Sequence, residues 1–216
     1  MNVYFVSGFL ANCRVFDKIK LPEGFEKKYL EWYIPRGDES LEEYAREMAK
    51  EVDITRPFVL IGYSFGGLVV QEMNRFLRPK KTIIMASMKS KAEEPSMFGI
   101  GRKVKFADRF PMDVISKDSV LSKLYIKYVY HIPPSESELF IDNIDPVYMK
   151  WSIKQLLDWT PPAEIENLYH IQGTKDRTFP IKGITGAIEV ENGDHLMVMK
   201  KAREINKILS EILRKN

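Results

Sequence analysis

The sequence has a single cysteine, Cys13, among its 216 residues, so no disulfide can form within the chain. Packing alone must hold the fold, which is typical of proteins in a reducing compartment. An excess of one charge is also absent, because 33 basic and 30 acidic side chains leave a formal net charge of only +3. With no aromatic and basic recognition pattern either, this balance predicts no nucleic-acid partner.

Long apolar runs are lacking as well. The apolar segment 1–13 has no basic leader and is shorter than a membrane span, and glycines interrupt the uncharged stretch 57–70. No His, Cys and Asp residues recur at the spacing of a metal site, so we expect no metal and no other cofactor. Together these absences predict a cytoplasmic protein without a membrane span.

What the sequence does contain is an alternation of short β-rich runs with helical segments. This alternation over a chain of ordinary composition predicts one α/β domain, 1–216, with a mainly parallel sheet and helices on both faces. The helices expected are 41–52, which a Ser40 and Glu43 capping box opens, 66–77 and 196–214. The strands expected, about six, are 2–7, 28–32, 57–61, 81–86, 168–172 and 185–190.

Residues 87–162 interrupt this alternation. They contain no clear strand pattern, several helical segments and many aromatic and Met side chains. A stretch of that length is not structureless inside a compact domain. We therefore predict a helical lid insertion that lies over the sheet.

The segment Gly62-Tyr63-Ser64-Phe65-Gly66-Gly67 has the pattern G-x-S-x-G between a buried strand run and a helix. Such a sharp reversal holds the serine in a strained conformation, and side chains at 62 and 66 would collide across it. The helix N-terminus then directs N–H groups to the place where negative charge develops. Ser64 is the predicted nucleophile, and a glycine-rich turn with an idle serine is the alternative.

A serine hydroxyl needs a neighbouring base, and the sequence has three histidines. His195 follows the last expected strand in a short polar turn, which places it at the same sheet edge as Ser64. It is the predicted base, and a helix-capping histidine is the alternative. His170 lies inside an expected strand, where it should be buried and structural, and His131 belongs to the insertion.

The base in turn needs a carboxylate that orients it. Asp176 is the only carboxylate in the loop that follows the strand 168–172, and this loop emerges at the same sheet edge. Asp194 is nearer to His195 in sequence, but adjacent residues point apart in an extended turn. Asp176 is therefore the predicted acid and Asp194 the alternative.

Acyl transfer also needs two donors for the developing alkoxide, each worth about 3 kcal/mol. The backbone N–H of Phe65, directly after the nucleophile, is the first predicted donor of this oxyanion hole. The second is the N–H of Phe9 in the loop after the first strand, with Leu10 as its alternative. Gly8 allows the backbone of that loop to approach closely.

In combination these segments resemble the compact bacterial α/β-hydrolases, the branch of carboxylesterases and pimeloyl-carrier-protein methyl ester esterases. The resemblance implies an α/β-hydrolase fold with the chain order Ser, Asp, His, and only the insertion is unmatched. Many relatives have His-Gly where this chain has Ser7-Gly8, and the start at the oxyanion-loop strand implies a reduced sheet. The matching segments are Gly8-Phe9, Gly62 to Gly67, His170 to Asp176 and Gly193-Asp194-His195.

The activity predicted is hydrolysis of a small-molecule carboxylic ester of a small or medium apolar acyl group through an acyl-enzyme. A thioesterase or carrier-linked ester hydrolase is the alternative, because residues 89–127 have nine basic and five acidic side chains that could dock an acidic acyl carrier. A solvated lid face is the favoured explanation of this charge. A ligand-binding protein or a lyase is the second alternative.

Four side chains are expected to line the acyl pocket. A lid that packs on its own core would show the same apolar composition, so a structural role is the alternative for them. The sequence does not indicate an oligomeric state. The four residues are Leu10, Phe98, Trp151 and Met197.

Overall fold

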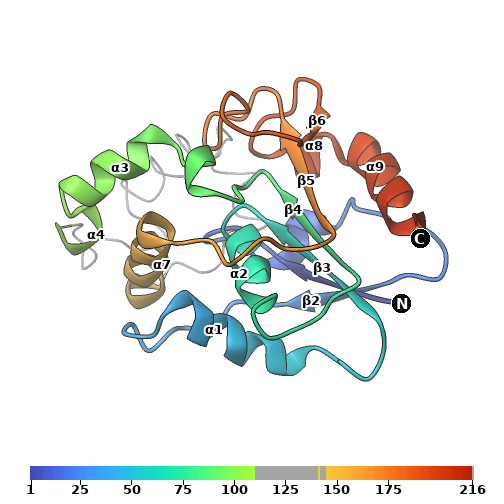
Figure 1. Cartoon of the computed structure of the whole chain (residues 1–216), viewed down its shortest axis with the longest axis horizontal. Coiled ribbons are helices and arrows are strands. Elements are labelled where there is room, and N and C mark those ends of the chain that lie inside the picture. Colours follow the sequence, from blue (N-terminus) through green and yellow to red (C-terminus); the bar gives the residue numbers. More distant parts are fainter. Residues whose placement is uncertain (110–140, 142–144, 216) are drawn as a thin grey trace.

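A six-stranded parallel sheet forms the centre of the computed structural model, which describes residues 1–109, 141 and 145–215 (Figure 1). The strand order is β2-β1-β3-β4-β5-β6, and each neighbouring pair is parallel. Parallel strands end at one edge, so the loops that follow them share that edge. The strands are β1 (Asn2–Val6), β2 (Glu26–Leu30), β3 (Phe58–Tyr63), β4 (Lys81–Met85), β5 (Leu168–Gly173) and β6 (Ile188–Val190).

All six strands predicted from the sequence are confirmed, although their ends differ from the predicted ones by up to three residues. β2 begins at Glu26, earlier than predicted, because Glu26 pairs with Asn2 at the start of β1. β6 is shorter than the predicted run 185–190 and begins at Ile188. Gly186 adopts a φ of 66°, which interrupts the extended backbone before the strand.

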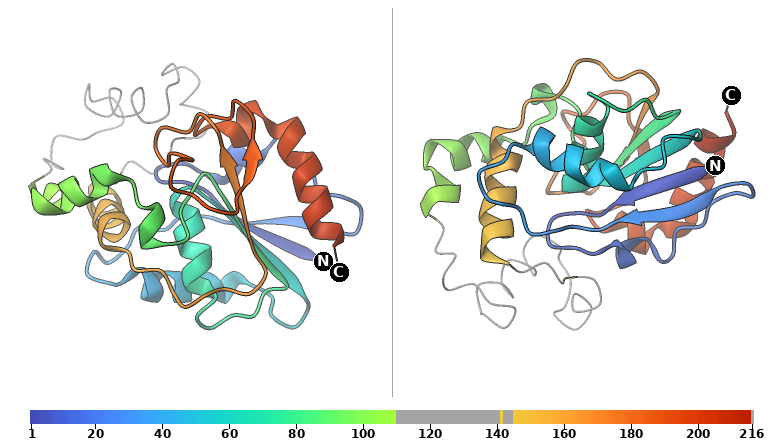
Figure 2. Two further views of the ribbon diagram at one scale, coloured as in Figure 1. Left: turned by 45° about the horizontal axis from the view of Figure 1, so that its top comes forward. Right: turned by 90° about the horizontal axis from the view of Figure 1, so that it is seen from below.

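Helices cover both faces of the sheet, as predicted (Figure 2). On one face lie α1 (Leu41–Met48), which continues into the 3-10 turn η2 (Ala49–Glu51), and α2 (Phe65–Met73). On the other lie η1 (Cys13–Phe16), α8 (Met197–Lys200) and α9 (Ala202–Arg214).

The helix boundaries differ from the predicted ones in two places. The predicted helix 196–214 is divided at Lys201 into α8 and α9. α2 ends at Met73, before residue 77, because the backbone N–H groups of Asn74, Arg75 and Phe76 bond carbonyls three residues earlier in a tight turn. The capping box that opens α1 is present, with the Ser40 side chain and Glu43 satisfying each other's backbone N–H groups.

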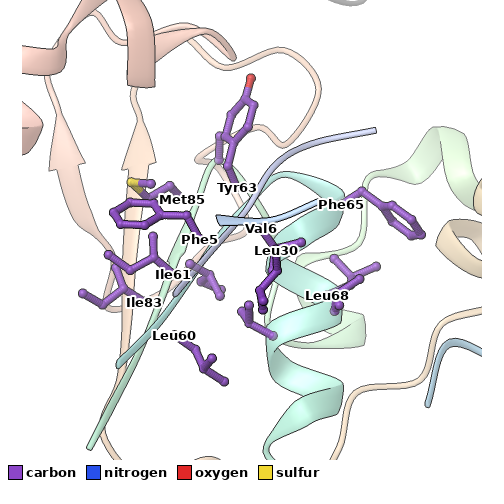
Figure 3. Close-up of a cluster of buried hydrophobic side chains, with 14 of the residues drawn as sticks. Phe5, Val6, Leu30, Leu60, Ile61, Tyr63, Phe65, Leu68, Ile83 and Met85 are labelled. Atoms are coloured by element: carbon purple, nitrogen blue, oxygen red, sulfur yellow. The ribbon is translucent and has the colours of Figure 1, made fainter. Parts of the chain in front are cut away.

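Strand side chains alternate between the two helical layers. Phe5, Ile61 and Ile83 gather on one side of the sheet, while Val6 and Leu30 lie toward α2 (Figure 3). All five are at most 1% exposed, so the sheet is buried on both faces. This explains why the central strands β1, β3 and β4 are largely continuous apolar runs in the sequence.

The regular elements in the described parts of 87–162 are helical, apart from an isolated bridge of Ile141 with Ala11, and their role as a lid stays a prediction. They comprise η3 (Lys91–Glu93), α3 (Ser96–Lys103), α4 (Phe106–Arg109) and α7 (Pro146–Asp158). The Trp151 indole N–H donates to the Glu39 carbonyl at 2.8 Å, which fastens α7 beside the start of α1. His131 lies outside the described residues. None of the described helices is long and apolar enough to cross a membrane.

Candidate active site

Ser64 lies at the reversal from β3 into α2, with φ 53° and ψ −120°. Non-glycine residues rarely adopt a positive φ, and here the surrounding glycines make the reversal possible. A Cβ at Gly66 would lie 2.3 Å from the Ser7 carbonyl oxygen, and one at Gly62 would lie 2.3 Å from the Gly66 carbonyl oxygen. The G-x-S-x-G pattern is thus a steric requirement of this turn.

The variant Gly66→Ala is expected to destabilise the protein by about 3 kcal/mol, because the obstructing atoms belong to the backbone and cannot rotate away. Urea unfolding followed by circular dichroism measures the change. Gly99→Ala in α3 is the matched control, since the atom nearest to its Cβ position belongs to the Arg102 guanidinium, 3.8 Å away. Equal stability of the two variants would contradict this steric account.

The side chains of Ser64, His195 and Asp176 form one hydrogen-bonded chain. Ser64 Oγ lies 3.0 Å from His195 Nε2, and His195 Nδ1 lies 2.9 Å from Asp176 Oδ2. The carboxylate can only accept, so Nδ1 is the protonated ring nitrogen and Nε2 presents its lone pair to the serine hydroxyl. All three residues are buried, with exposed fractions of 3% to 6%.

Asp176 is held by donors on both carboxylate oxygens. Oδ1 accepts from the backbone N–H groups of Thr178 at 2.8 Å and Phe179 at 3.0 Å, and Oδ2 accepts from the Gln172 amide at 3.1 Å. Burial by itself favours the neutral acid, but His195 and the two backbone donors outweigh it and lower the pKa of Asp176 below its ordinary value. The carboxylate is therefore ionised at neutral pH.

Two aromatic side chains, one of which also supplies a hydroxyl, fix the position of His195. The Tyr63 hydroxyl donates to the His195 carbonyl at 2.7 Å, and the Tyr63 and Phe179 rings lie 5.5 and 5.9 Å from the imidazole. Asp194, the alternative acid, instead accepts from the Leu196 N–H at 3.0 Å and pairs with the Lys200 ammonium at 2.5 Å. The structure thus brings Asp176, and not Asp194, to the imidazole.

The loop after β1 approaches the nucleophile closely. A Cβ at Gly8 would lie 3.2 Å from the Ser64 Cβ, and the turn from Gly8 to Ala11 is closed by a 3.1 Å backbone hydrogen bond with Leu10 at φ 63°. Phe65 is the first residue of α2, so its N–H has no acceptor within the helix. These positions suit the predicted oxyanion donors Phe65 and Phe9, whose role stays a prediction.

Sequence reasoning missed the side chains that support the loop after β1 and the turn at Ser64. The Ser7 hydroxyl donates to the Ala11 carbonyl at 2.5 Å and accepts from the Trp32 indole at 2.8 Å. Ser7 stands where many of the resembling proteins have His, so this departure from the pattern was the available signal. On the other side of the turn at Ser64, the Ser87 hydroxyl donates to the Ser64 carbonyl at 2.9 Å.

The four predicted pocket residues are all buried, with exposed fractions of 6% or less. Leu10 lies in the loop after β1, and Met197 is the first residue of α8, shortly after His195. The Phe98 ring meets Phe179 edge to face at 5.8 Å. Trp151 lies 4.4 Å from the Tyr44 ring and 6.0 Å from that of Phe65. Their part in substrate binding stays a prediction.

Among the described residues, no group of three or more His, Cys, Asp or Glu side chains could hold a metal ion. No family model and no curated protein matches the sequence. Solved structures do match over nearly the whole chain. An esterase from Thermogutta terrifontis aligns with a TM-score of 0.66 at 16% identity, covering 99% of this chain and 89% of that one.

Two further structures agree with this match. One, described among epoxide hydrolases of the alpha/beta hydrolases superfamily from hot-environment metagenomes, has a TM-score of 0.74 at 15% identity and covers 100% of this chain and 91% of its own. The chain adopts the α/β-hydrolase fold. An enol-lactonase from Burkholderia xenovorans also shares this α/β-hydrolase fold, with a TM-score of 0.71 at 16% identity over 99% of this chain and 91% of that one. The low identities establish the fold alone.

Proposed function

We propose that the protein is a serine hydrolase that cleaves carboxylic esters through an acyl-enzyme on Ser64. The observation that carries the proposal is the buried chain of two hydrogen bonds, 3.0 and 2.9 Å long, from Ser64 Oγ through His195 to Asp176. A lone serine at neutral pH is a poor nucleophile, whereas one bonded to an oriented imidazole lone pair is activated. The solved α/β-hydrolase neighbours, which include an esterase, support this class of reaction.

In the acylation step, Ser64 Oγ attacks the ester carbonyl carbon while His195 Nε2 takes the hydroxyl proton. The carbonyl oxygen becomes an alkoxide, which the N–H groups of Phe65 and Phe9 would stabilise. When the tetrahedral adduct collapses, the bond to the leaving alcohol breaks and the imidazolium returns the proton to the alcohol oxygen. Asp176 stabilises the imidazolium and keeps Nδ1 protonated throughout.

Water then repeats the sequence from the other side of the acyl-enzyme. His195 takes a proton from the water as its oxygen attacks the acyl carbon, and it returns that proton to Ser64 Oγ when the acid leaves. The enzyme is regenerated without any other reactant.

Apolar side chains around the triad favour an apolar acyl group of small or medium size as the substrate portion. Phe98 contacts Phe179, which in turn stacks on the imidazole, and Leu10 is only 1% exposed. A carrier-linked substrate has less support. The basic residues Lys91 and Arg102 both pair with Glu94, which neutralises part of the positive charge that an acidic carrier would need.

Labelling with a fluorophosphonate tests the proposal. We expect the folded protein to bind one equivalent of the reagent, with the added mass on the peptide that contains Ser64, because only an activated serine reacts. The same reagent should not label the urea-unfolded protein. Hydrolysis of p-nitrophenyl esters of increasing acyl length should accompany the labelling. A folded protein that neither reacts with the reagent nor turns over any ester would instead be a ligand-binding protein.

A further inference from the structure

A second line of buried polar side chains leads from Asp176 to β5. His170 and Gln172 are two residues apart on β5, so their side chains share one face of the sheet. They are 3% and 0% exposed. Gln172 Oε1 lies 3.2 Å from His170 Nε2, while its amide nitrogen donates to Asp176 Oδ2 at 3.1 Å. Buried polar groups in an apolar core are costly unless they are paired, so this arrangement needs an explanation.

The orientation of the Gln172 amide is determined by its neighbours. Its nitrogen has two partners, Asp176 Oδ2 at 3.1 Å and the Phe179 carbonyl at 2.7 Å, and both can only accept. A flipped amide would place oxygen against two oxygens. Gln172 Oε1 must therefore point at His170, and the contact is a hydrogen bond only if His170 Nε2 carries the proton.

His170 is suited to this donor role. Burial foremost, with the Lys89 charge, lowers its pKa to about 4, although the hydrogen bond to Gln172, the Ser87 backbone and the Asp176 charge oppose this shift. The charged groups nearest to the ring are Glu93, whose Oε2 lies 3.9 Å from Nδ1, Lys89, which pairs with Glu93 at 3.5 Å, and Asp176. His170 is thus neutral at neutral pH, with one ring N–H that Gln172 fixes on Nε2.

The two hydrogen bonds have one consequence for the triad. Gln172 donates to the same oxygen of Asp176 that faces His195 Nδ1, whereas the backbone donors of Thr178 and Phe179 hold the other oxygen. The backbone bonds anchor the carboxylate, and the Gln172 amide sets the rotation and the charge of the oxygen that orients the base. The contact between the His170 ring and Oε1 supports the same orientation of the amide from its other end.

We propose that Gln172 is a positioning residue for Asp176 and that His170 locks the Gln172 amide in the orientation this requires. The inference rests on the proposed function, because it concerns the acid of the same triad. It adds two residues of β5 to the side chains on which the rate of ester hydrolysis depends. Neither touches the reacting atoms, so both act through Asp176 and His195.

The variant Gln172→Met tests the first part, since it keeps the length of the side chain and removes the amide. We expect kcat for a p-nitrophenyl ester to fall about 10- to 100-fold, as for other supporting partners of functional side chains, with KM changed by less than about twofold. The acid limb of the kcat/KM profile should move to higher pH, because the carboxylate loses a donor and holds the imidazolium proton more strongly. A loss through poorer packing would not move that limb.

A pair of variants at His170 tests the second part. His170→Gln places an amide nitrogen near the position of Nε2 and should recover most of the activity, whereas His170→Met leaves Gln172 Oε1 without a donor and should resemble Gln172→Met. Tyr169→Phe, on the opposite face of β5, is the control that should match wild type. Should Gln172→Met fail to fold, the His170 pair still decides the question. Equal activity of the two His170 variants would contradict the role of His170 in holding the Gln172 amide.

Different experimental outcomes would contradict this inference and the proposed function. An inactive and unlabelled wild-type protein would contradict the function itself. An active wild type with an equally active Gln172→Met variant and an unmoved acid limb would contradict only the positioning role. The low-field proton resonance of His195 Nδ1–H gives a readout that is independent of turnover, and it should shift in Gln172→Met but not in Tyr169→Phe.

Discussion

Replacement of Ser64 by Ala should lower kcat for ester hydrolysis about 10⁶-fold, to the level at which only binding and the oxyanion donors remain. The variant removes the attacking oxygen and leaves His195 with no proton to accept. Stopped assays with p-nitrophenyl esters at high enzyme concentration measure the residual activity. Fluorophosphonate labelling should disappear in the same variant.

The buried serine of α7, Ser152, provides the matched control. Its hydroxyl is 1% exposed and has no hydrogen-bond partner in the described structure, so Ser152→Ala should leave kcat unchanged. The double variant of Ser64 and His195 should be no slower than Ser64→Ala, because the two side chains act as one unit. A Ser64→Ala protein that retains more than about one hundredth of the wild-type kcat would exclude the acyl-enzyme mechanism.

The parts of the fold that local pattern specifies were predictable. β3 and β4 are continuous apolar runs because both faces of the sheet are covered, and the reversal at Ser64 needs glycines within four residues of one another. Three segments that each follow a parallel strand must share one edge. This topological argument places Ser64, Asp176 and His195 together, and the structure shows them within hydrogen-bonding distance.

The supporting contacts were not predictable, because they join segments that no local pattern relates. Trp32 reaches Ser7 from beyond β2, and the Ser87 hydroxyl reaches Ser64 from the end of β4. His170 was predicted to be buried and structural, and it is buried, but its bond to Gln172 depends on the amide orientation that two acceptors impose. Such choices follow from tertiary packing, which pairs side chains after the elements are in place.

Replacement of Asp176 by Asn should lower kcat about 10⁴-fold, although the two side chains have the same shape. The carboxylate has four partners, and all of them are donors: two backbone N–H groups at Oδ1, and the Gln172 amide and His195 Nδ1 at Oδ2. An Asn side chain offers one acceptor and one donor. Whichever way it turns, its NH₂ group faces two donors.

Each orientation of the substituted amide in Asp176→Asn has a different cost. With NH₂ toward His195, Nδ1 must accept, so Nε2 carries the proton and points it at Ser64 instead of a lone pair. With NH₂ toward the loop, the backbone N–H groups of Thr178 and Phe179 lose their acceptor, at about 1–3 kcal/mol each. The first orientation disables the base and the second destabilises the fold.

Asp194→Asn is the control for Asp176→Asn. The Asp194 side chain bonds Leu196 and Lys200 instead of the imidazole, so this variant should lower kcat by less than about twofold.

The pH dependence of the unfolding free energy tests the charge of Asp176 in the fold. The pKa of Asp176 is lower in the fold than its ordinary value, since His195 and the backbone donors outweigh the effect of burial. A carboxyl of this kind stabilises the fold above its unfolded pKa, about 4, and this contribution is lost as the pH falls through the folded pKa. The difference in unfolding free energy between wild type and Asp176→Asn should therefore be constant above about pH 5 and shrink below about pH 4. A difference that stays constant down to about pH 2 would mean that folding does not lower the pKa of Asp176, so that His195 and the backbone donors do not stabilise its charge.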